Sequence, residues 1–128
     1  MGGNLMNEDY VSFEVAKLLK EKGFDSHYST LFYKNDKLEF YKEERKKYWL
    51  KVDEYAAPTL CMAQKWLRET KDIHIMIDIY ASGYYAVLWK TNGTFIKTLV
   101  DKGPNDGGVW NTYEDALNAG ILETLKLI

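Results

Sequence analysis

The sequence is poor in the residues that mark an extracellular, metal-binding or membrane protein. It has one cysteine, Cys61, which cannot form an internal disulfide, and two histidines, His27 and His74. No Cys/His/carboxylate cluster shows the spacing of a metal site. The longest apolar runs are far too short to span a bilayer, and residues 1–10 lack the basic start and apolar stretch of a signal peptide. We therefore expect a cytoplasmic protein that holds no cofactor.

The sequence also has little net charge. Its 17 Lys and Arg residues against 19 Asp and Glu residues give a formal charge of −2, and basic and acidic residues balance in each half, at 10 and 11 in residues 1–57 and at 7 and 8 in residues 58–128. No basic lobe is present to attract phosphate, which disfavours nucleic-acid binding as the leading function. The 128 residues, 46% of them hydrophobic, predict a single domain that folds without disulfides or metals.

Three segments have the pattern of amphipathic helices. The first, residues 12–22, begins at a capping serine, and Gly23 follows it as a left-handed stop. The second, residues 58–69, has Pro58 at its first position. The third, residues 113–127, is capped by Thr112. Each segment spaces its apolar residues three and four apart, which predicts one buried side per helix.

Short runs rich in aromatic and β-branched residues predict strands in both halves of the chain. Residues 73–80 alternate strictly between apolar and polar, so they are the clearest strand. Two more strands are predicted at Tyr84–Thr91 and Thr94–Val100. Three N-terminal runs are predicted to be short strands or irregular extended pieces: His27–Tyr33, Leu38–Tyr41 and Tyr48–Val52.

The turns between the last three strands determine which residues share a face. Asn92-Gly93 is a strong signal for a type I′ hairpin turn. For residues 81–83 we expect a three-residue loop with Gly83 in the left-handed region, because a two-residue turn would scatter the apolar residues over both faces. The three-residue loop gathers the four isoleucines of residues 73–80 on one face with Val87, Trp89, Ile96 and Val100.

These elements predict an α+β fold. Residues 58–128 follow the order α-β-β-β-α, with both helices on the isoleucine face of an antiparallel sheet, and residues 1–57 add a helix and short aromatic-rich strands. The second face of the sheet carries Met76, Leu88, Leu99 and Phe95, and is too apolar to stand in water. We expect residues 25–57 to cover it; the alternative is that these four residues form the surface for a partner protein or a second copy of the chain.

Few residues indicate catalysis. Cys61 has no histidine near it in sequence, so we interpret it as a small buried hydrophobe. His74 and Asp78 share a face of one strand but lie about 13 Å apart, too far to form a pair. The segment Asp101–Gly108 lacks the ligands of a calcium loop and the lysine of a phosphate loop, so we expect a flexible connection. The mixed-sign run Lys42–Lys47 is typical of a solvated turn.

The α-β-β-β-α order of residues 58–128 resembles that of the double-stranded-RNA-binding domain, although Glu114 and Asp115 open the last helix where that family has lysines. That resemblance implies nucleic-acid binding. The stretch Gly83-Tyr84-Tyr85-Ala86-Val87, with Tyr113-Glu114-Asp115-Ala116-Leu117, is similar to the β-β-β-α core of HicB-type antitoxins.

A third resemblance extends over nearly the whole chain. It is carried by Val11–Phe24, by Ala57-Pro58-Thr59 with Ala63–Glu69, and by Tyr113–Ala116 with Leu125–Ile128. These stretches resemble a group of small uncharacterised proteins carried by phages and prophages of Bacteroides-type gut bacteria. The sequence therefore predicts a non-enzymatic binding protein of phage or prophage origin that contacts a host or phage protein, not a membrane. The alternative is a nucleic-acid-binding protein.

Overall fold

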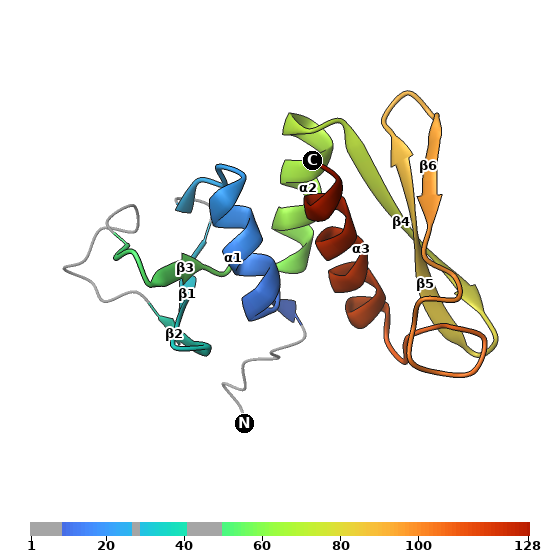
Figure 1. The fold of residues 1–128 in the computed structure, drawn as a ribbon, viewed down its shortest axis with the longest axis horizontal. Helices are drawn as coiled ribbons and strands as arrows, with labels where there is room; N and C mark the ends of the chain where they lie inside the picture. The colour runs from blue at the N-terminus through green and yellow to red at the C-terminus, as the bar shows by residue number, and fades with distance from the viewer. Residues whose placement is uncertain (1–8, 27–28, 41–49) are drawn as a thin grey trace.

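The computed structural model describes residues 9–26, 29–40 and 50–128. Within these ranges the chain forms three helices and two antiparallel sheets of three strands (Figure 1). This is the α+β class that the sequence predicts. In chain order, the elements are α1 (Phe13–Glu21), β1 (Leu31–Lys34), β2 (Lys37–Phe40), β3 (Glu54–Ala56), α2 (Leu60–Thr70), β4 (Ile73–Tyr80), β5 (Gly83–Lys90), β6 (Phe95–Thr98) and α3 (Tyr113–Leu127).

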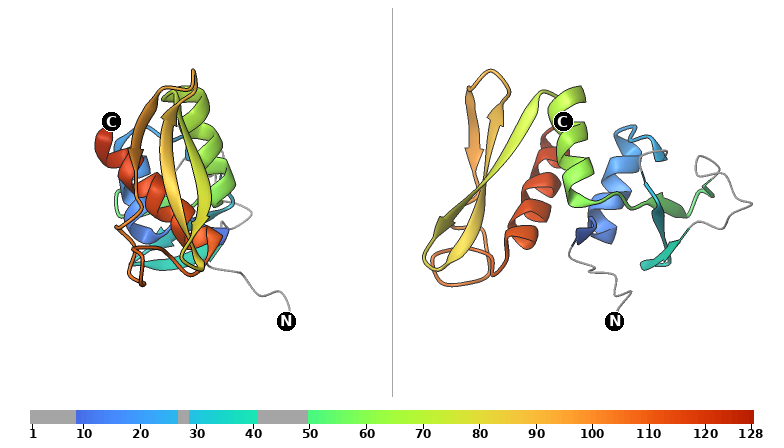
Figure 2. Two further views of the ribbon diagram at one scale, coloured as in Figure 1. Left: turned by 90° about the vertical axis from the view of Figure 1, so that its right-hand side faces the viewer. Right: turned by 180° about the vertical axis from the view of Figure 1, so that it is seen from behind.

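The two sheets lie on opposite sides of the helices. The N-terminal sheet has the strand order β2-β1-β3 and the C-terminal sheet the order β4-β5-β6. Across the molecule the N-terminal sheet comes first, then α1, then α2 and α3, then the C-terminal sheet (Figures 1 and 2). The expectation that residues 25–57 cover the second face of the C-terminal sheet is therefore wrong. Their strands pack on α1 instead, because a helix between two layers can bury residues on both of its sides.

The predicted signals at both ends of α1 are confirmed. The Ser12 hydroxyl accepts a hydrogen bond from the Val15 N–H at 3.2 Å. At the other end Gly23 has a φ of +90°, and the Phe24 N–H donates to the Leu19 carbonyl at 3.0 Å. This arrangement is a Schellman motif, in which a left-handed residue lets the chain turn back over the last helical carbonyls.

The start of α2 differs from the prediction by two residues. The helix begins at Leu60, and Thr59 caps it by accepting a hydrogen bond from the Met62 N–H at 3.1 Å. A threonine side chain can accept a hydrogen bond from a free N–H of the first turn, which a proline ring cannot do. Pro58 therefore lies just before the cap, and not at the first helical position.

The N-terminal sheet contains the predicted turn but a different third strand. Asn35 and Asp36 both have positive φ values, 50° and 59°, and join β1 to β2. The third strand is β3, and not the predicted Tyr48–Val52. Residues 50–52, the described part of that segment, form no strand, and the Lys51 and Val52 carbonyls accept hydrogen bonds from the Lys20 ammonium group at 3.2 and 3.0 Å. Residues 27–28 and 41–49, where parts of the predicted strands fall, lie outside the described residues.

The turn between β4 and β5 has two residues, so the predicted three-residue loop is wrong. Tyr80 lies opposite Gly83, and Ala81 and Ser82 between them have φ values of 51° and 64°. Gly83 is needed because Val109 packs closely against its backbone, and not because the turn requires a left-handed residue there. A Cβ atom at this position would lie 2.5 Å from a Val109 side-chain carbon.

The turn between β5 and β6 has the longer loop, also contrary to the prediction. The Lys90 N–H donates to the Thr94 carbonyl at 2.7 Å, which leaves three residues in the loop. Of these, Gly93 alone has a positive φ, +94°. The Asn92 side chain accepts a hydrogen bond from the Thr94 N–H at 2.9 Å. Asparagine thus stabilises this turn through its side chain, and not by adopting the left-handed conformation of a type I′ turn.

The two-residue turn moves strand β5 by one position against β4 and so exchanges its two faces. Ile75 lies opposite Leu88, and His74 lies opposite Trp89. Leu88 and Leu99 are 0% and 3% exposed and belong to the core beside the helices. Their predicted place on the second face is wrong, and Trp89, which we expected beside Ile75, lies on that second face instead.

One cluster of buried residues joins both halves of the chain. It contains Val15 and Leu19 of α1 and Leu31 of β1 together with Leu88 and Ile121. Helix α3 lies very close to the C-terminal sheet, because a Cβ atom at Gly120 would come within 2.8 Å of Ile75 and 2.9 Å of Ala86. This packing fixes the inner face of the C-terminal sheet and leaves its other face turned away from the helices.

Candidate functional site

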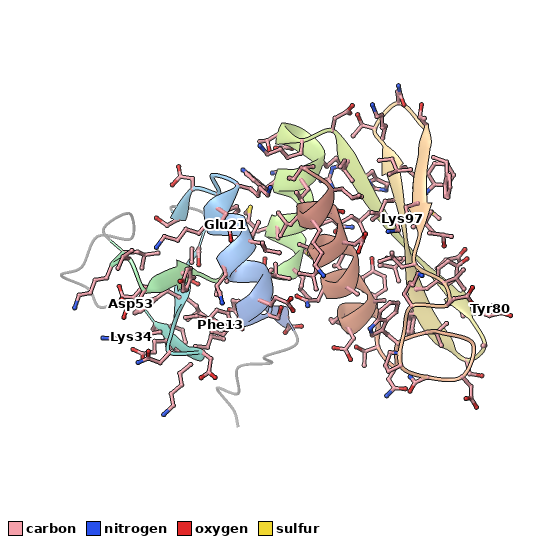
Figure 3. The ribbon with its side chains drawn as sticks, in the orientation of Figure 1. Phe13, Glu21, Lys34, Asp53, Tyr80 and Lys97 are labelled. Atoms are coloured by element: carbon pink, nitrogen blue, oxygen red, sulfur yellow. The ribbon has the colours of Figure 1, made fainter. Side chains whose placement is uncertain are left out.

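The face of the C-terminal sheet that is turned away from the helices is the strongest candidate. We call it the outer face. Met76, Tyr80 and Phe95 on it are 37%, 53% and 54% exposed, and Tyr80 projects from the far end of the sheet (Figure 3). From the register, its side chains are those of His74, Met76, Asp78, Tyr80, Tyr85, Val87, Trp89 and Phe95. Two of the four predicted surface residues, Met76 and Phe95, therefore lie here.

Aromatic rings on the outer face pack edge to face. The rings of Trp89 and Phe95 lie 5.5 Å apart at 76°, and those of Tyr80 and Tyr85 lie 6.5 Å apart at 90°. Such pairs stabilise aromatic side chains relative to one another even where one ring edge meets water. The pairs give this face a defined shape at both ends.

A hollow of about 440 Å³ opens at the end of the outer face nearest α2. We call it the basic hollow, because each of its titratable lining residues is basic. They converge because only Lys71 and Asp72 separate α2 from β4, so the last turn of the helix lies beside the first residues of the strand. The hollow is lined by Arg68, His74, Met76, Trp89, Lys90, Thr91 and Gly93.

Hydrogen bonding in and beside the basic hollow has two notable features: one carboxylate is already engaged, and one buried donor is unpaired in the described part of the chain. The carboxylate of Asp72 accepts a hydrogen bond from the hydroxyl of Thr91, a lining residue, and the Thr91 N–H donates to the Asp72 carbonyl at 3.3 Å. The Trp89 indole nitrogen is buried and has no hydrogen-bond partner among the described residues. A buried donor without an acceptor costs about 1–3 kcal/mol.

The opposite end of the outer face carries an acidic group. Asp78 accepts hydrogen bonds from the Ile79 N–H at 2.8 Å and from the Tyr85 hydroxyl at 3.5 Å. Desolvation of the hydroxyl, and then the negative charge of Asp78, raise the pKa of Tyr85 above 10. The outer face thus has the basic hollow at one end, Met76 and Val87 in its middle and Asp78 at the other end.

Cys61, predicted to be buried, is exposed. The buried side of α2 consists of Leu60, Ala63 and Leu67, and one residue along a helix turns the side chain by about 100°. Cys61 therefore lies beside the buried stripe and not in it. No described His, Cys, Asp or Glu residues gather in a group of three that could hold a metal ion.

The segment Asp101–Gly108 forms a folded loop and not an open connection. The Gly103 N–H donates to the Gly108 carbonyl at 2.8 Å, and the Asn105 N–H to the Val109 carbonyl at 3.1 Å. Val109 is buried beneath the loop. The mixed-sign run of residues 42–47 lies outside the described residues.

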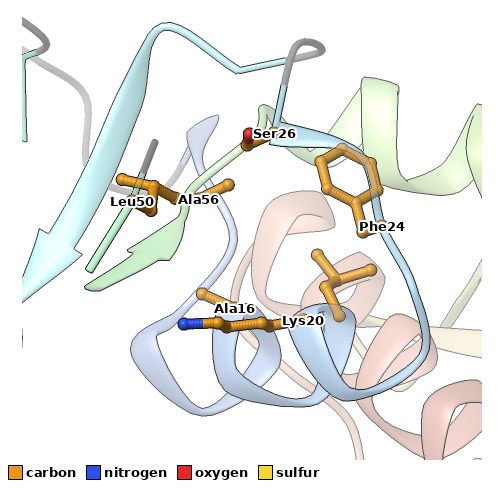
Figure 4. A pocket seen from close by; sticks show the side chains of 7 residues that line it. Ala16, Lys20, Phe24, Ser26, Leu50 and Ala56 are labelled. Atoms are coloured by element: carbon orange, nitrogen blue, oxygen red, sulfur yellow. The ribbon is translucent and has the colours of Figure 1, made fainter. Parts of the chain in front are cut away.

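A smaller hollow of about 160 Å³ lies between α1 and β3 (Figure 4). Its walls are mainly apolar, and Lys20 stands at its edge. The Lys20 ammonium group donates to the Glu54 carbonyl at 3.0 Å and lies 4.8 Å from the centre of the Tyr55 ring. Because Lys20 is engaged in holding β3 against α1, this hollow is part of the joint between helix and sheet.

A hollow of about 550 Å³ lies where α1 and α3 begin. Phe13 and Tyr33 give it aromatic walls, and Asp36, Glu114 and Asp115 make it acidic. The two carboxylates of α3 lie in its first turn, where they stabilise the helix dipole. Their position is therefore explained by the helix itself.

Comparisons of the chain with protein-family models, with curated protein sequences and with solved structures found no match. In the part of the chain that the structure describes, no helix combines the length and the apolar character needed to cross a membrane.

The sequence reasoning found Met76 and Phe95 but missed the basic hollow. Arg68 belongs to α2 and Lys90 to β5. The sequence places them at the same hollow only if the β4–β5 register is known. The available signal was the short connection at Lys71 and Asp72, which forces the end of α2 to lie beside the start of β4.

Proposed function

We propose that this chain is a non-enzymatic binding protein whose outer face contacts another protein. The observation that carries the proposal is the exposed apolar set of Met76, Tyr80 and Phe95 on a sheet face that no described helix or strand covers. Contiguous exposed apolar groups with a polar rim are typical of interaction surfaces.

The composition of the outer face supports a protein partner. Aromatic residues, methionine and arginine are enriched in the centres of protein interfaces. Here Trp89 and Phe95 form a rigid aromatic pair, Met76 adapts its shape beside them, and Arg68 stands at the rim. The resemblance to phage and prophage proteins supports a partner encoded by a host or a phage, and the single free thiol of Cys61 supports a cytoplasmic setting.

Nucleic-acid binding is the second candidate. It is favoured by the basic hollow, where Arg68 and Lys90 could meet a phosphate and Trp89 could stack on a base. Asp78 opposes it at the other end of the same face, and Glu114 and Asp115 oppose it at the start of α3. A phosphate backbone that followed the whole face would meet these negative charges.

The test is affinity capture from a bacterial lysate with three forms of the full chain. The outer-face variant is Met76→Ser with Phe95→Ser. The matched control is Phe40→Ser with Val52→Ser, since these residues are 63% and 88% exposed on the other side of the molecule. We expect a protein that the wild type and the control retain and the outer-face variant loses.

Equal capture by all three forms would contradict the proposal. Gel shifts with single- and double-stranded DNA and RNA at low salt separate the second candidate, because binding to phosphate weakens steeply as salt rises. A salt-sensitive shift that needs Arg68 and Lys90 would favour nucleic acid over protein.

A further inference from the structure

We infer that the partner segment presents an acidic side chain to the basic hollow and apolar side chains to the middle of the outer face. The inference rests on the proposed function and names the chemistry of the partner. Its first support is charge, because the cations of Arg68 and Lys90 line the hollow beside the His74 ring, and none of the described residues that line it is a carboxylate. A carboxylate group entering there meets donors and positive charge on several sides.

The second support is the unpartnered indole of Trp89. Its nitrogen can only donate a hydrogen bond, and it is buried with no acceptor in the part of the chain that the structure describes. A carboxylate only accepts hydrogen bonds and has two oxygens to offer. A small movement of the side chains around Trp89 would bring the indole N–H to one oxygen while Arg68 and Lys90 neutralise the charge.

The third support is the order of charged and apolar groups along the outer face. His74 at the hollow and Asp78 at the other end are four residues apart along β4, a distance of about 13 Å. An extended segment of about five residues covers this distance. Met76 lies between these ends, and Phe95 lies beside Trp89 at the level of His74. Apolar residues of the segment pack on these two side chains, and the segment's far end must be neutral or basic to lie beside Asp78. This pattern fits a peptide better than a nucleic acid, which carries phosphate along its entire length.

The experiment is a selection of random twelve-residue peptides displayed on phage against the immobilised full chain. We expect the enriched peptides to contain an aspartate or glutamate beside apolar residues. Synthetic copies are then titrated into ¹⁵N-labelled protein, with the Trp89 indole resonance assigned from the Trp89→Phe variant. We expect that resonance to shift on titration, and replacement of the peptide's acidic residue by its amide to abolish the shift.

Affinity measurements on two double variants complete the test. Arg68→Gln with Lys90→Gln should weaken binding by about tenfold or more, as expected for the loss of charge-assisted hydrogen bonds. The matched control, Lys37→Gln with Lys126→Gln, removes two exposed lysines elsewhere and should leave binding unchanged. Thermal melting of both variants verifies that they are folded.

The outcomes separate this inference from the proposed function. Peptides that lack acidic residues but still need Met76 and Phe95 would overturn the inference and leave the proposed function standing. A selection that enriches no peptide dependent on Met76 and Phe95 would overturn both. Tighter, salt-sensitive binding of a fifteen-nucleotide single-stranded DNA or RNA through Arg68 and Lys90 would overturn the inference in favour of nucleic acid.

Discussion

Replacing Ser82 by glycine should stabilise the protein, because the turn between β4 and β5 holds Ser82 in the left-handed region. Its φ is 64°, a conformation that costs an L-residue roughly 1–2 kcal/mol. Glycine removes that cost but adds about 0.5–1 kcal/mol of chain entropy to the unfolded state. The net gain for Ser82→Gly is about 0.5–1 kcal/mol. Ser82 is exposed, so no packing is lost with its side chain.

Urea unfolding followed by far-ultraviolet circular dichroism measures this gain as a higher midpoint with an unchanged slope. In a thermal melt we expect an increase of about 2–3 °C. Ser82→Ala is the control, since it removes the hydroxyl and keeps the left-handed strain, and it should leave stability nearly unchanged.

The sign of the effect distinguishes the two-residue turn from a three-residue loop. In a three-residue loop with Gly83 in the left-handed position, Ser82 would have a negative φ, and glycine would destabilise by about 0.5–1 kcal/mol. Destabilisation by Ser82→Gly would therefore refute both the register and the face assignment that follows from it.

Three further predictions concern the core, a helix end and pH. Gly120→Ala should destabilise by about 1–2 kcal/mol in urea unfolding, because the added methyl lies 2.8 Å from Ile75 and overpacking outweighs the helix propensity of alanine. Gly23→Ala should cost about 1 kcal/mol in the same assay through backbone strain alone, since its φ is +90° and no atom lies within 4 Å of the new Cβ. Tyr85 has a raised pKa through desolvation and Asp78, so it binds its proton more tightly when folded. The contribution of Tyr85 to the free energy of unfolding is therefore complete below pH 10 and is lost as the pH rises further. Tyr85→Phe should flatten the alkaline limb of a plot of melting temperature against pH.

The elements of this fold could be predicted where local signals determine them. The caps at Ser12 and Thr112 and the stop at Gly23 depend on residues within one turn of each other, and the structure contains all three. The strict alternation of residues 73–80 likewise identified β4. These signals require no knowledge of distant parts of the chain.

The turn types could not be predicted, because tertiary contacts overrode local preference. Ala81 and Ser82 are poor residues for a type I′ turn, yet they form the two-residue turn between β4 and β5. The adjacent Gly83 is needed where Tyr84 exchanges backbone hydrogen bonds with Trp110, at 2.9 and 2.8 Å. A side chain at Gly83 would collide with the strand segment that makes this bridge. The glycine that suggested a turn thus serves a contact 26 residues further along the chain.

The candidate site depended on this same register. A one-residue error exchanged Trp89 for Leu88 on the outer face and turned a mixed aromatic surface into an aliphatic one. Met76 was placed correctly because it lies on β4, and Phe95 because the three-residue loop between β5 and β6 offsets the shift of β5 at this position. The basic hollow could not be found at all, since Lys90 joins Arg68 only through the pairing of β5 with β4.

The observed exchange of faces also explains how the outer face can stay in water without a partner. Leu88 and Leu99 would offer water only apolar surface, whereas the structure buries both. Tyr80 and Tyr85 expose aromatic bodies that end in hydroxyl groups, and amphipathic rings of this kind tolerate both water and an apolar partner. The buried indole nitrogen of Trp89 has no acceptor among the described residues, and an acceptor supplied by a partner would remove the cost of that unpaired donor. A surface with these properties favours reversible binding over permanent burial.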